Sequence, residues 1–237
     1  MAVGRHLPPD SHAVEAFMAH FEERYRFEGL GQGAMVLMIP AAHHRLNFIH
    51  PFPDGNGRVS RLMSHAMALK AGIGAHGLWS ISRGLARGLE SRGDYKRLMD
   101  YADSPRQGDL DGRGSLSEKA LREFTLWFLR VCVDQVRFMA GLFDLDNLSR
   151  RYRRYISQSD LLRPEAALLI EEALLRGQVE RGAASRITGL PERSARRVLN
   201  ETVKAGLLAS ESPKGPVFPA FPDDALDVLF PQLYPGS

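Results

Sequence analysis

A helical repeat of apolar residues is the feature that most constrains how this chain folds. Through most of residues 11–156, apolar side chains recur every three or four positions, which is the spacing of an amphipathic helix. No stretch before residue 160 alternates between apolar and polar residues as a half-buried strand does. We therefore expect an all-α core. The expected helices cover residues 11–27, 31–49, 57–72 and 116–156, the last of them broken near Gly141.

The composition narrows the class of protein. The 237 residues are 44% hydrophobic and 25% charged, with a formal net charge of +3. This balance is ordinary for a soluble globular protein and excludes a polycation that coats nucleic acid. The one cysteine, Cys132, excludes an internal disulfide, and its apolar neighbours predict a buried thiol. We find no signal peptide and no apolar run long enough to span a membrane, so we expect a cytoplasmic protein.

The last third of the chain has a different pattern. Two short extended runs around Pro213-Lys214-Gly215 follow three expected helices, and a turn containing Gly189 separates the second helix from the third. The three expected helices cover residues 164–176, 180–188 and 191–205. This order resembles winged helix-turn-helix modules. We therefore expect a first domain over residues 1–160 and a second, small domain over residues 161–237.

The stretch IHPFPDGNGRVSRL, residues 49–62, contains the strongest candidate site. Gly55 and Gly57 flank Asn56, and such glycines allow a left-handed backbone in which successive N–H groups surround an anion. The helix expected to begin near Arg58 adds unpaired N–H groups and the positive end of its dipole. Arg58 and Arg61 share one face of that helix and suit phosphate oxygens. Together these features predict a cradle for a polyphosphate.

Two side chains beside the cradle predict its chemistry. Asp54 suits Mg²⁺, which takes one or two carboxylates and completes its shell with phosphate oxygens and water. His50 is suited to accept a proton near neutral pH. Taken singly, Gly-Asn-Gly is a common turn, and two arginines three residues apart are often a solvated helix face. Their occurrence in this order indicates phosphoryl or nucleotidyl transfer from a nucleoside triphosphate.

The same stretch matches the Fic family signature His-x-Phe-x-Asp/Glu-Gly-Asn-Gly-Arg-x-x-Arg at every fixed position, from His50 to Arg61. The flanking segments AAHHRLNFIH and RGDYKRLMDYAD are similar to the family as well, and the resemblance extends over roughly residues 1–160. It implies a Fic-type helical core. Fic proteins usually transfer AMP from ATP to a hydroxyl group of a target protein, which makes a protein the expected substrate.

The resemblance also implies roles for single residues. His50 takes the proton of a Ser, Thr or Tyr hydroxyl as it attacks the α-phosphate, and Asp54 holds Mg²⁺. Tyr95 resembles the family's aromatic residue near the adenine, with an ordinary core tyrosine as the alternative, and Asp103 lies where relatives often carry a polar residue. The groups implied to hold the phosphates of ATP are the backbone of Gly55, Asn56 and Gly57, the Asn56 side chain, Arg58 and, at the γ-phosphate, Arg61.

Two family features are incomplete here. Fic domains generally carry a β-hairpin flap ahead of the motif, which docks the target as an added strand. Residues 1–10, MAVGRHLPPD, resemble only the tail of such a flap, and an ordinary loose N-terminus is the alternative. Many Fic proteins also carry an inhibitory helix with the pattern Ser/Thr-x-x-x-Glu-Gly/Asn, and we find no such pattern in this chain.

Three functions follow from the sequence. The first is AMP transfer, the second is transfer of another group such as phosphoryl, and the third is a nucleotide-sensing regulator that binds DNA. For the third, the expected recognition helix carries arginine and asparagine side chains that suit base edges and phosphates. These residues are Arg193, Arg196, Arg197 and Asn200. Winged helices also dock proteins, so a protein partner or a second copy of this chain in a homodimer is the alternative to DNA.

Overall fold

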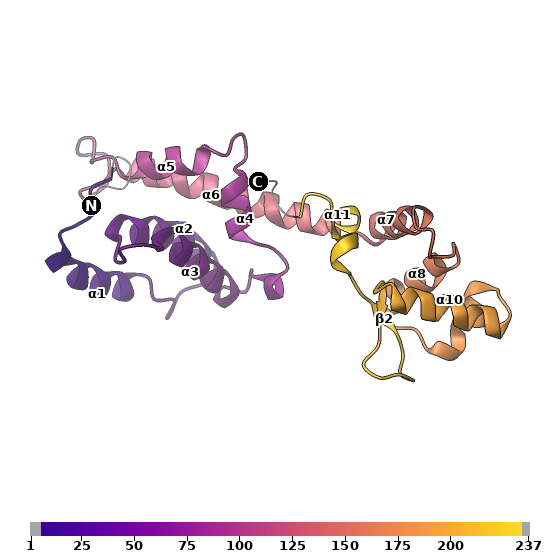
Figure 1. Cartoon of the computed structure of the whole chain (residues 1–237). Coiled ribbons are helices and arrows are strands. Elements are labelled where there is room, and N and C mark those ends of the chain that lie inside the picture. Colours follow the sequence, from indigo (N-terminus) through magenta and orange to yellow (C-terminus); the bar gives the residue numbers. More distant parts are fainter. Residues whose placement is uncertain (1–5, 234–237) are drawn as a thin grey trace. The chain divides into compact units, whose positions relative to one another are not determined.

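Helix α6, Glu118–Leu142, carries the central apolar face of the N-terminal part of the chain. The computed structural model describes residues 6–233, apart from the side chain of His76, and Figure 1 shows its elements in chain order. On α6, Phe124, Phe128 and Val131 follow one another at helical spacing, and each is 0% exposed. Burying such a stripe requires other helices on that side, which is why the N-terminal part of the chain folds as a layered helical core.

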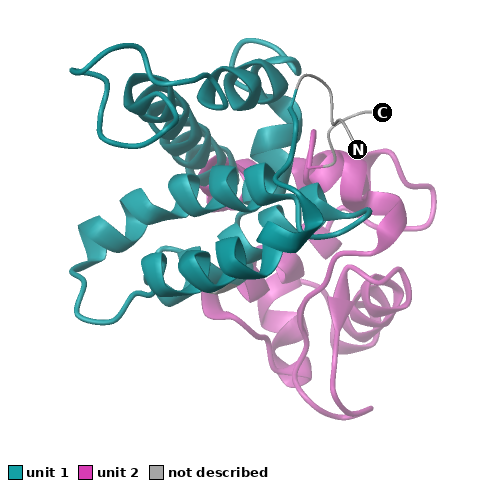
Figure 2. Cartoon of the chain, turned by 90° about the vertical axis from the view of Figure 1, so that its left-hand side faces the viewer, with its two compact units in different colours: residues 1–139 teal, residues 140–237 magenta. Residues whose placement is uncertain are grey.

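Two compact units make up the chain, residues 1–139 and residues 140–237, shown in two colours in Figure 2. The first unit is helical, as the sequence predicts. Its core joins α6 to apolar residues of the shorter helices, among them Ile39, Ile81 and Leu98. Its elements before α6 are a 3-10 turn at Ser11–Ala13, α1 Val14–Arg24, α2 Gln32–Ile49, α3 Asn56–Lys70, a 3-10 turn at Ala75–Gly77, α4 Ile81–Arg87 and α5 Asp94–Ala102.

Helices α2 and α3 pack against each other and position the signature stretch between them. Helix α2 continues through Pro40, which is buried. It ends at Ile49, just before Pro51, because a proline cannot supply the N–H group that would extend the helix. Helix α3 begins at Asn56, so residues 50–55 are the connection that carries most of the signature.

The second unit contains the three helices and the two extended runs predicted for the last third of the chain. Strands β1, Leu208–Ala209, and β2, Phe218–Pro219, are antiparallel, with Leu208 opposite Pro219 and Ala209 opposite Phe218. The helices of this unit are α7 Leu145–Ser157, α8 Ala166–Arg176, a 3-10 turn at Arg181–Ala183 with α9 Ala184–Thr188, α10 Glu192–Lys204, and a 3-10 turn at Asp223–Ala225 with α11 Leu226–Leu229. That they form a winged helix-turn-helix module stays a prediction.

The division between the units differs from the domain boundary expected at residue 160. Helix α7 lies before residue 160 but belongs to the second unit, where it contacts α8 and α11. The hydroxyl of Tyr152, a residue that is 0% exposed, donates a hydrogen bond of 2.9 Å to the carbonyl of Ala220. The sequence predicts the boundary in the polar stretch after α7. The apolar side of α7 packs against α8 and α11, so a division by contacts lies before α7.

Three expectations about the rest of the chain have different outcomes. Cys132 is buried as predicted, and this burial raises the pKa of its thiol to about 12. No helix in the described part of the chain is both long and apolar enough to cross a membrane. The expected flap remnant lies partly outside the described residues, because the structure describes only residues 6–10 of it.

Candidate functional site

His50 sits at the C-terminal end of α2 in a left-handed backbone conformation. Its φ and ψ are 53° and 54°, and its N–H group donates to the carbonyl of Leu46 at 3.0 Å. A non-glycine residue in this region costs roughly 1–2 kcal/mol. Among the described residues only Ala75 and Gln232 share a positive φ without being glycine. The left-handed turn ends α2 directly before His50. Residues in a strained backbone conformation of this kind are concentrated at functional sites.

Asn56 holds the connection between α2 and α3 in shape. Its Nδ2 donates to the carbonyl of Phe52 at 2.6 Å, and its Oδ1 accepts from the N–H of Phe52 at 3.0 Å. The residue is only 3% exposed. Both polar atoms of the Asn56 side chain therefore bond the main chain of Phe52, and its predicted contact with the phosphates stays a prediction.

The start of α3 forms part of the predicted anion cradle. Gly55 has a φ of 88°, the left-handed conformation that the glycine was expected to supply. Its own N–H group donates to Asp54 Oδ1 at 2.6 Å, and the N–H of Arg58 donates to the Gly55 carbonyl at 2.9 Å. No described residue accepts a hydrogen bond from the N–H groups of Asn56 and Gly57. Two amides therefore remain available for an anion at the positive end of the α3 dipole.

Asp54 and Arg58 form an ion pair at the surface, with 2.9 Å between Oδ2 and Nη2. Their side chains are 91% and 73% exposed, so the pair adds little to stability. A single accessible carboxylate fits Mg²⁺ that takes its remaining ligands from phosphates and water. The described residues contain no group of three or more His, Cys, Asp or Glu side chains that could hold a metal ion without such help.

A cleft of about 750 Å³ brings together five of the residues singled out from the sequence, namely His50, Gly57, Arg61, Tyr95 and Asp103. Its volume lies in the range of sites for small molecules and cofactors, roughly 300–1,000 Å³. Asp54, Gly55, Asn56 and Arg58 do not line this cleft. The predicted site therefore divides into a cleft wall and a loop beside it.

Arg61 also lines a second, smaller cavity of about 390 Å³ together with Arg58 and His65. The three side chains lie at positions i, i+3 and i+7 of α3, which places them on one face of that helix. Arg61 therefore stands between the two cavities. A methyl group at Gly57 would lie 3.2 Å from Nη1 of Arg61, so the missing side chain at Gly57 leaves room for this guanidinium.

Tyr95 forms a fixed part of the cleft wall. Its hydroxyl donates to Nε2 of His43 at 2.9 Å, and Nδ1 of His43 donates to Oγ of Ser64 at 2.9 Å. Burial lowers the pKa of His43 to about 3, so its ring is neutral and has one donor and one acceptor nitrogen. Burial also raises the pKa of Tyr95 to about 12. The tyrosine is thus tied to α2 and α3 while its ring borders the cleft.

Several other residues of the cleft are absent from the sequence prediction. Met99 and Asp100 come from α5, the helix that ends just before Asp103. His6, Asn47, Lys96 and Arg97 complete the lining. The signal that could have indicated Lys96 and Arg97 is their position directly after Tyr95 on a helix. Nothing in the sequence indicates His6, because its partners lie far away in the chain.

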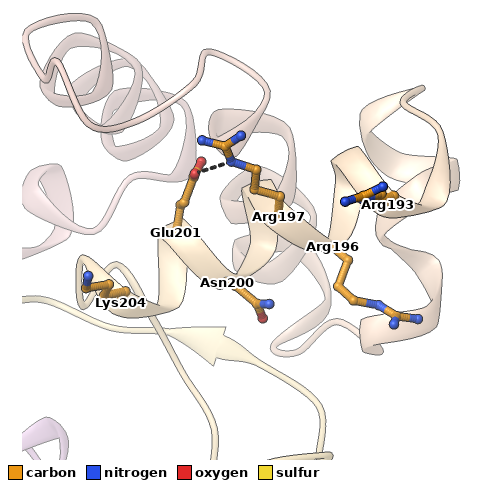
Figure 3. A pocket seen from close by; sticks show the side chains of 6 residues that line it. All are labelled: Arg193, Arg196, Arg197, Asn200, Glu201 and Lys204. Carbon is orange, nitrogen blue, oxygen red and sulfur yellow. Dashed lines mark hydrogen bonds and ion pairs between the residues drawn. The ribbon is translucent and has the colours of Figure 1, made fainter.

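The predicted recognition residues come together on α10 in the second unit. Arg193, Arg196, Arg197 and Asn200 line a surface hollow of about 330 Å³ with Glu201 and Lys204. Figure 3 shows Arg197 turned toward Glu201, whose Oε1 accepts from Nε at 2.8 Å. That carboxylate raises the pKa of Arg197. For Arg193 and Arg196 no ion pair with another described residue is found, so the hollow carries positive charge that no described acid neutralises.

Comparisons with known proteins agree with the N-terminal motif. Residues 2–68 match the family model described as the Fic/DOC family. A protein adenylyltransferase Fic from Drosophila erecta is 39% identical over 70 residues, and one from Aedes aegypti is 38% identical over 76 residues. Each match covers 30% of this chain and 14% of the relative, so the chain spans only a small part of the curated relatives it matches.

One solved structure is also similar to this chain. It is a Fic family protein from Desulfovibrio desulfuricans G20, with a TM-score of 0.43 and 19% sequence identity. The match covers 92% of this chain and 59% of that protein.

Replacing Asn56 with aspartate tests the role assigned to its side chain. The carboxylate at position 56 can still accept a hydrogen bond from the Phe52 N–H. It has no N–H group to donate to the Phe52 carbonyl, so that bond is lost. We expect the free energy of unfolding to fall by about 1–3 kcal/mol. The exposed neighbour serves as the control, because Asp54→Asn should change it by less than about 0.5 kcal/mol. Equal effects of the two substitutions in denaturant titrations would contradict the assignment.

The buried His43 predicts a specific loss of stability in acid. Its pKa is about 3 in the folded protein and about 6.5 in the unfolded chain. Between these values the unfolded chain binds one more proton, so stability falls as pH decreases, by at most about 1.4 kcal/mol per pH unit. His43→Gln removes this titration, and its stability should depend less on pH between 6.5 and 3. The exposed His12→Gln should keep the wild-type slope, and identical slopes in all three proteins would refute the prediction.

Proposed function

We propose that this chain, whose residues 2–68 carry a Fic/DOC family domain, transfers AMP from ATP to a hydroxyl group of a target protein. The strongest support for this proposal is the set of groups that line one cleft. His50, Arg61 and Gly57 line one cleft, and the Gly57 amide at its edge has no acceptor among the described residues. A proton acceptor, a cation and an open amide are the groups that hydroxyl attack on a bound triphosphate requires.

In this proposal the reaction is a single displacement at the α-phosphorus. Nε2 or Nδ1 of His50 takes the proton of the target hydroxyl as its oxygen attacks. The new bond joins that oxygen to the α-phosphorus, and the bond from the α-phosphorus to the bridging oxygen breaks. Pyrophosphate leaves with that oxygen, while Arg61 and the amides of Asn56 and Gly57 stabilise the negative charge of the phosphates.

Arg58 and Asp54 contribute from the loop beside the cleft. We assign Asp54 as the ligand of Mg²⁺. When bound, the ion would neutralise part of the negative charge of the phosphates. Asp54 is now paired with Arg58, so binding of the ion requires this exposed pair to separate, which costs little. Arg58 is then available to the phosphates. Tyr95 provides the aromatic wall, which suits a nucleobase.

Labelled ATP tests the reaction directly. The purified chain is incubated with host lysate and with ATP carrying the label either on the α-phosphate or on the γ-phosphate. We expect a protein band labelled only from the α-phosphate, and loss of at least a hundredfold in His50→Ala, in line with the usual contribution of a general base. His12→Ala, an exposed histidine, is the matched control. Label from the γ-phosphate would instead establish the alternative, phosphoryl transfer, and overturn AMP transfer.

The exposed face of α10 favours a second function, which is binding of DNA by the C-terminal unit. Arg193, Arg196, Asn200 and Lys204 line one hollow, and among the six residues drawn in Figure 3 only Arg197 is bonded to the acid, Glu201. Arginine and asparagine on one helix suit phosphates and base edges in a major groove. Protein docking, including docking of a second copy, is the alternative use of the same face.

A salt series distinguishes the two uses of α10. For DNA, a gel shift by the full chain at low salt should weaken as salt rises, because binding releases counterions. Arg196→Ala should weaken it and lower the slope of log K against log salt by about one. Arg154→Ala, an exposed arginine on α7, removes the same charge elsewhere and should have a smaller effect. No shift at low salt would reject DNA and leave protein docking.

A further inference from the structure

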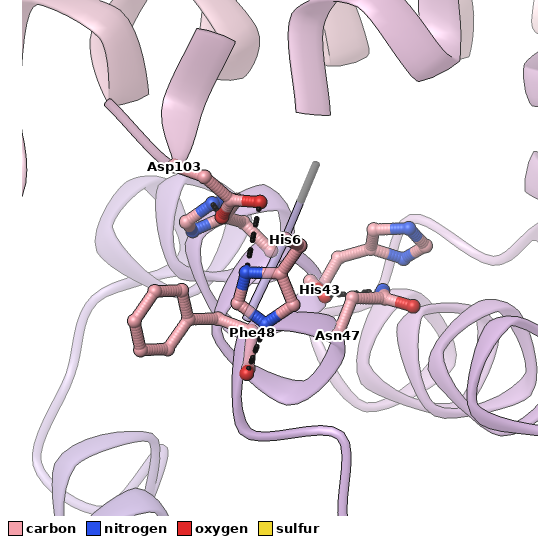
Figure 4. A network of polar contacts seen from close by, with 6 residues as sticks. His6, His43, Asn47, Phe48 and Asp103 are labelled. Atoms are coloured by element: carbon pink, nitrogen blue, oxygen red, sulfur yellow. Dashed lines mark hydrogen bonds and ion pairs between the residues drawn. The ribbon is translucent and has the colours of Figure 1, made fainter. Parts of the chain in front are cut away.

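His6 joins two elements of the cleft that are far apart in the sequence. Its Nε2 lies 2.7 Å from the carbonyl oxygen of Phe48, and its Nδ1 lies 3.3 Å from Oδ2 of Asp103. Figure 4 shows the ring between these two partners. The rings of His6 and Phe48 are also in contact, with 4.9 Å between their centroids. The His6 side chain is only 10% exposed, although it belongs to the N-terminal segment.

The Phe48 carbonyl is available to His6 for a structural reason. In a continuous helix it would accept from the N–H group four residues later, which belongs to Phe52. That N–H group donates to Oδ1 of Asn56 instead, because the helix has ended. The last carbonyls of a helix need partners from outside it, and His6 supplies one.

Asp103 extends the contact into the interior of the first unit. Its other oxygen, Oδ1, lies 2.9 Å from Nε2 of His44, a side chain that is only 2% exposed. Asp103 follows the last residue of α5, the helix that carries Tyr95. A single chain of polar contacts therefore runs from the last turn of α2 through His6 and Asp103 back to α2, and it includes the end of α5.

Both partners of His6 are acceptors. A carbonyl oxygen lies at Nε2 and a carboxylate oxygen lies at Nδ1, so each ring nitrogen faces an oxygen that can accept a hydrogen bond. The charged and titratable groups around this contact are Asp103, His44, Arg45 over the Phe48 ring, and the cations of the cleft. Those cations belong to Arg61, Lys96 and Arg97, with His50 and Asp100 also on the cleft wall.

We propose that His6 is a positioning residue of the cleft, which clamps the last turn of α2 and fixes the backbone that presents His50. Phe48 lies two residues before His50, and the His50 N–H bonds within the same turn, to Leu46. A clamp on the Phe48 carbonyl therefore limits how far the left-handed turn at His50 can open. The clamp itself is a matter of structure, and only its effect on activity rests on the proposed function.

Amide hydrogen exchange measures the clamp without any assumption about activity. In His6→Ala, the amides of residues 48–50 should exchange about tenfold faster or more, because the last turn of α2 loses the hydrogen bond on its Phe48 carbonyl. His12→Ala, another histidine near the N-terminus, should leave this turn unchanged. Amides of α8, in the second unit, report on general destabilisation. Unchanged exchange of residues 48–50 in His6→Ala would overturn the proposal.

Two further variants distinguish a clamp made by hydrogen bonds from one made only by packing of the His6 ring against Phe48. His6→Arg supplies donors for both acceptors and should restore at least part of the protection. His6→Phe keeps a ring in contact with Phe48 but donates nothing, so it should exchange as fast as His6→Ala. Full protection in His6→Phe would show that packing alone holds the turn and would overturn the proposal.

The transfer assay then tests the consequence for catalysis. A positioning role predicts that His6→Ala lowers kcat about tenfold and changes the KM for ATP less than threefold, because a misplaced base affects the chemical step. A rise in KM alone would identify His6 as a ligand contact and contradict the positioning role. If the wild-type chain transfers nothing, the proposed function fails while the exchange result still decides whether the clamp exists.

Discussion

The pair of hydrogen bonds between the Asn56 side chain and the main chain of Phe52 is the interaction on which the rest of the site depends. These two bonds join the start of α3 to Phe52 and so fix the conformation of the connection between α2 and α3. The pair also occupies the N–H group that would otherwise continue the bonding of α2, so the carbonyl of Phe48 faces outward to His6. The same pair sets Gly55 at the start of α3, where two amides lack described acceptors.

The polar and charged groups of the site are arranged in two layers around the connection between α2 and α3. Arg61 borders both the large cleft and the smaller cavity, whereas Arg58 and Asp54 neutralise each other on the exposed side. Buried polar groups lie behind the wall, where His43 fixes Tyr95 through Nε2 and meets Ser64 through Nδ1. The buried layer therefore positions side chains, and the accessible layer holds the charges that a phosphate group would meet.

Much of this arrangement could be predicted from the sequence, and the reasons for the rest are physical. The helical repeat predicts α2, α3 and α6 because burial of one face depends on local spacing, and Gly55 has the predicted left-handed conformation. The bonds of Asn56 to the Phe52 main chain are absent from the sequence prediction, because an amide side chain can bond either a phosphate or a backbone. His6, His43 and Asp103 form contacts across long sequence separations, which no local pattern encodes. The boundary at residue 160 stays a prediction, and it differs from the division by contacts because the polarity of a loop does not indicate against which unit the preceding helix α7 packs.

The lone thiol has a practical consequence for studying this chain. Cys132 is only 9% exposed, and its elevated pKa keeps it protonated at neutral pH, whereas the reactive species is the thiolate. Maleimide or spin-label reagents should therefore leave the native protein almost untouched. Two cysteines introduced at exposed positions, one in each unit, then become the only sites of attachment, so distances between the two units can be measured without first removing Cys132.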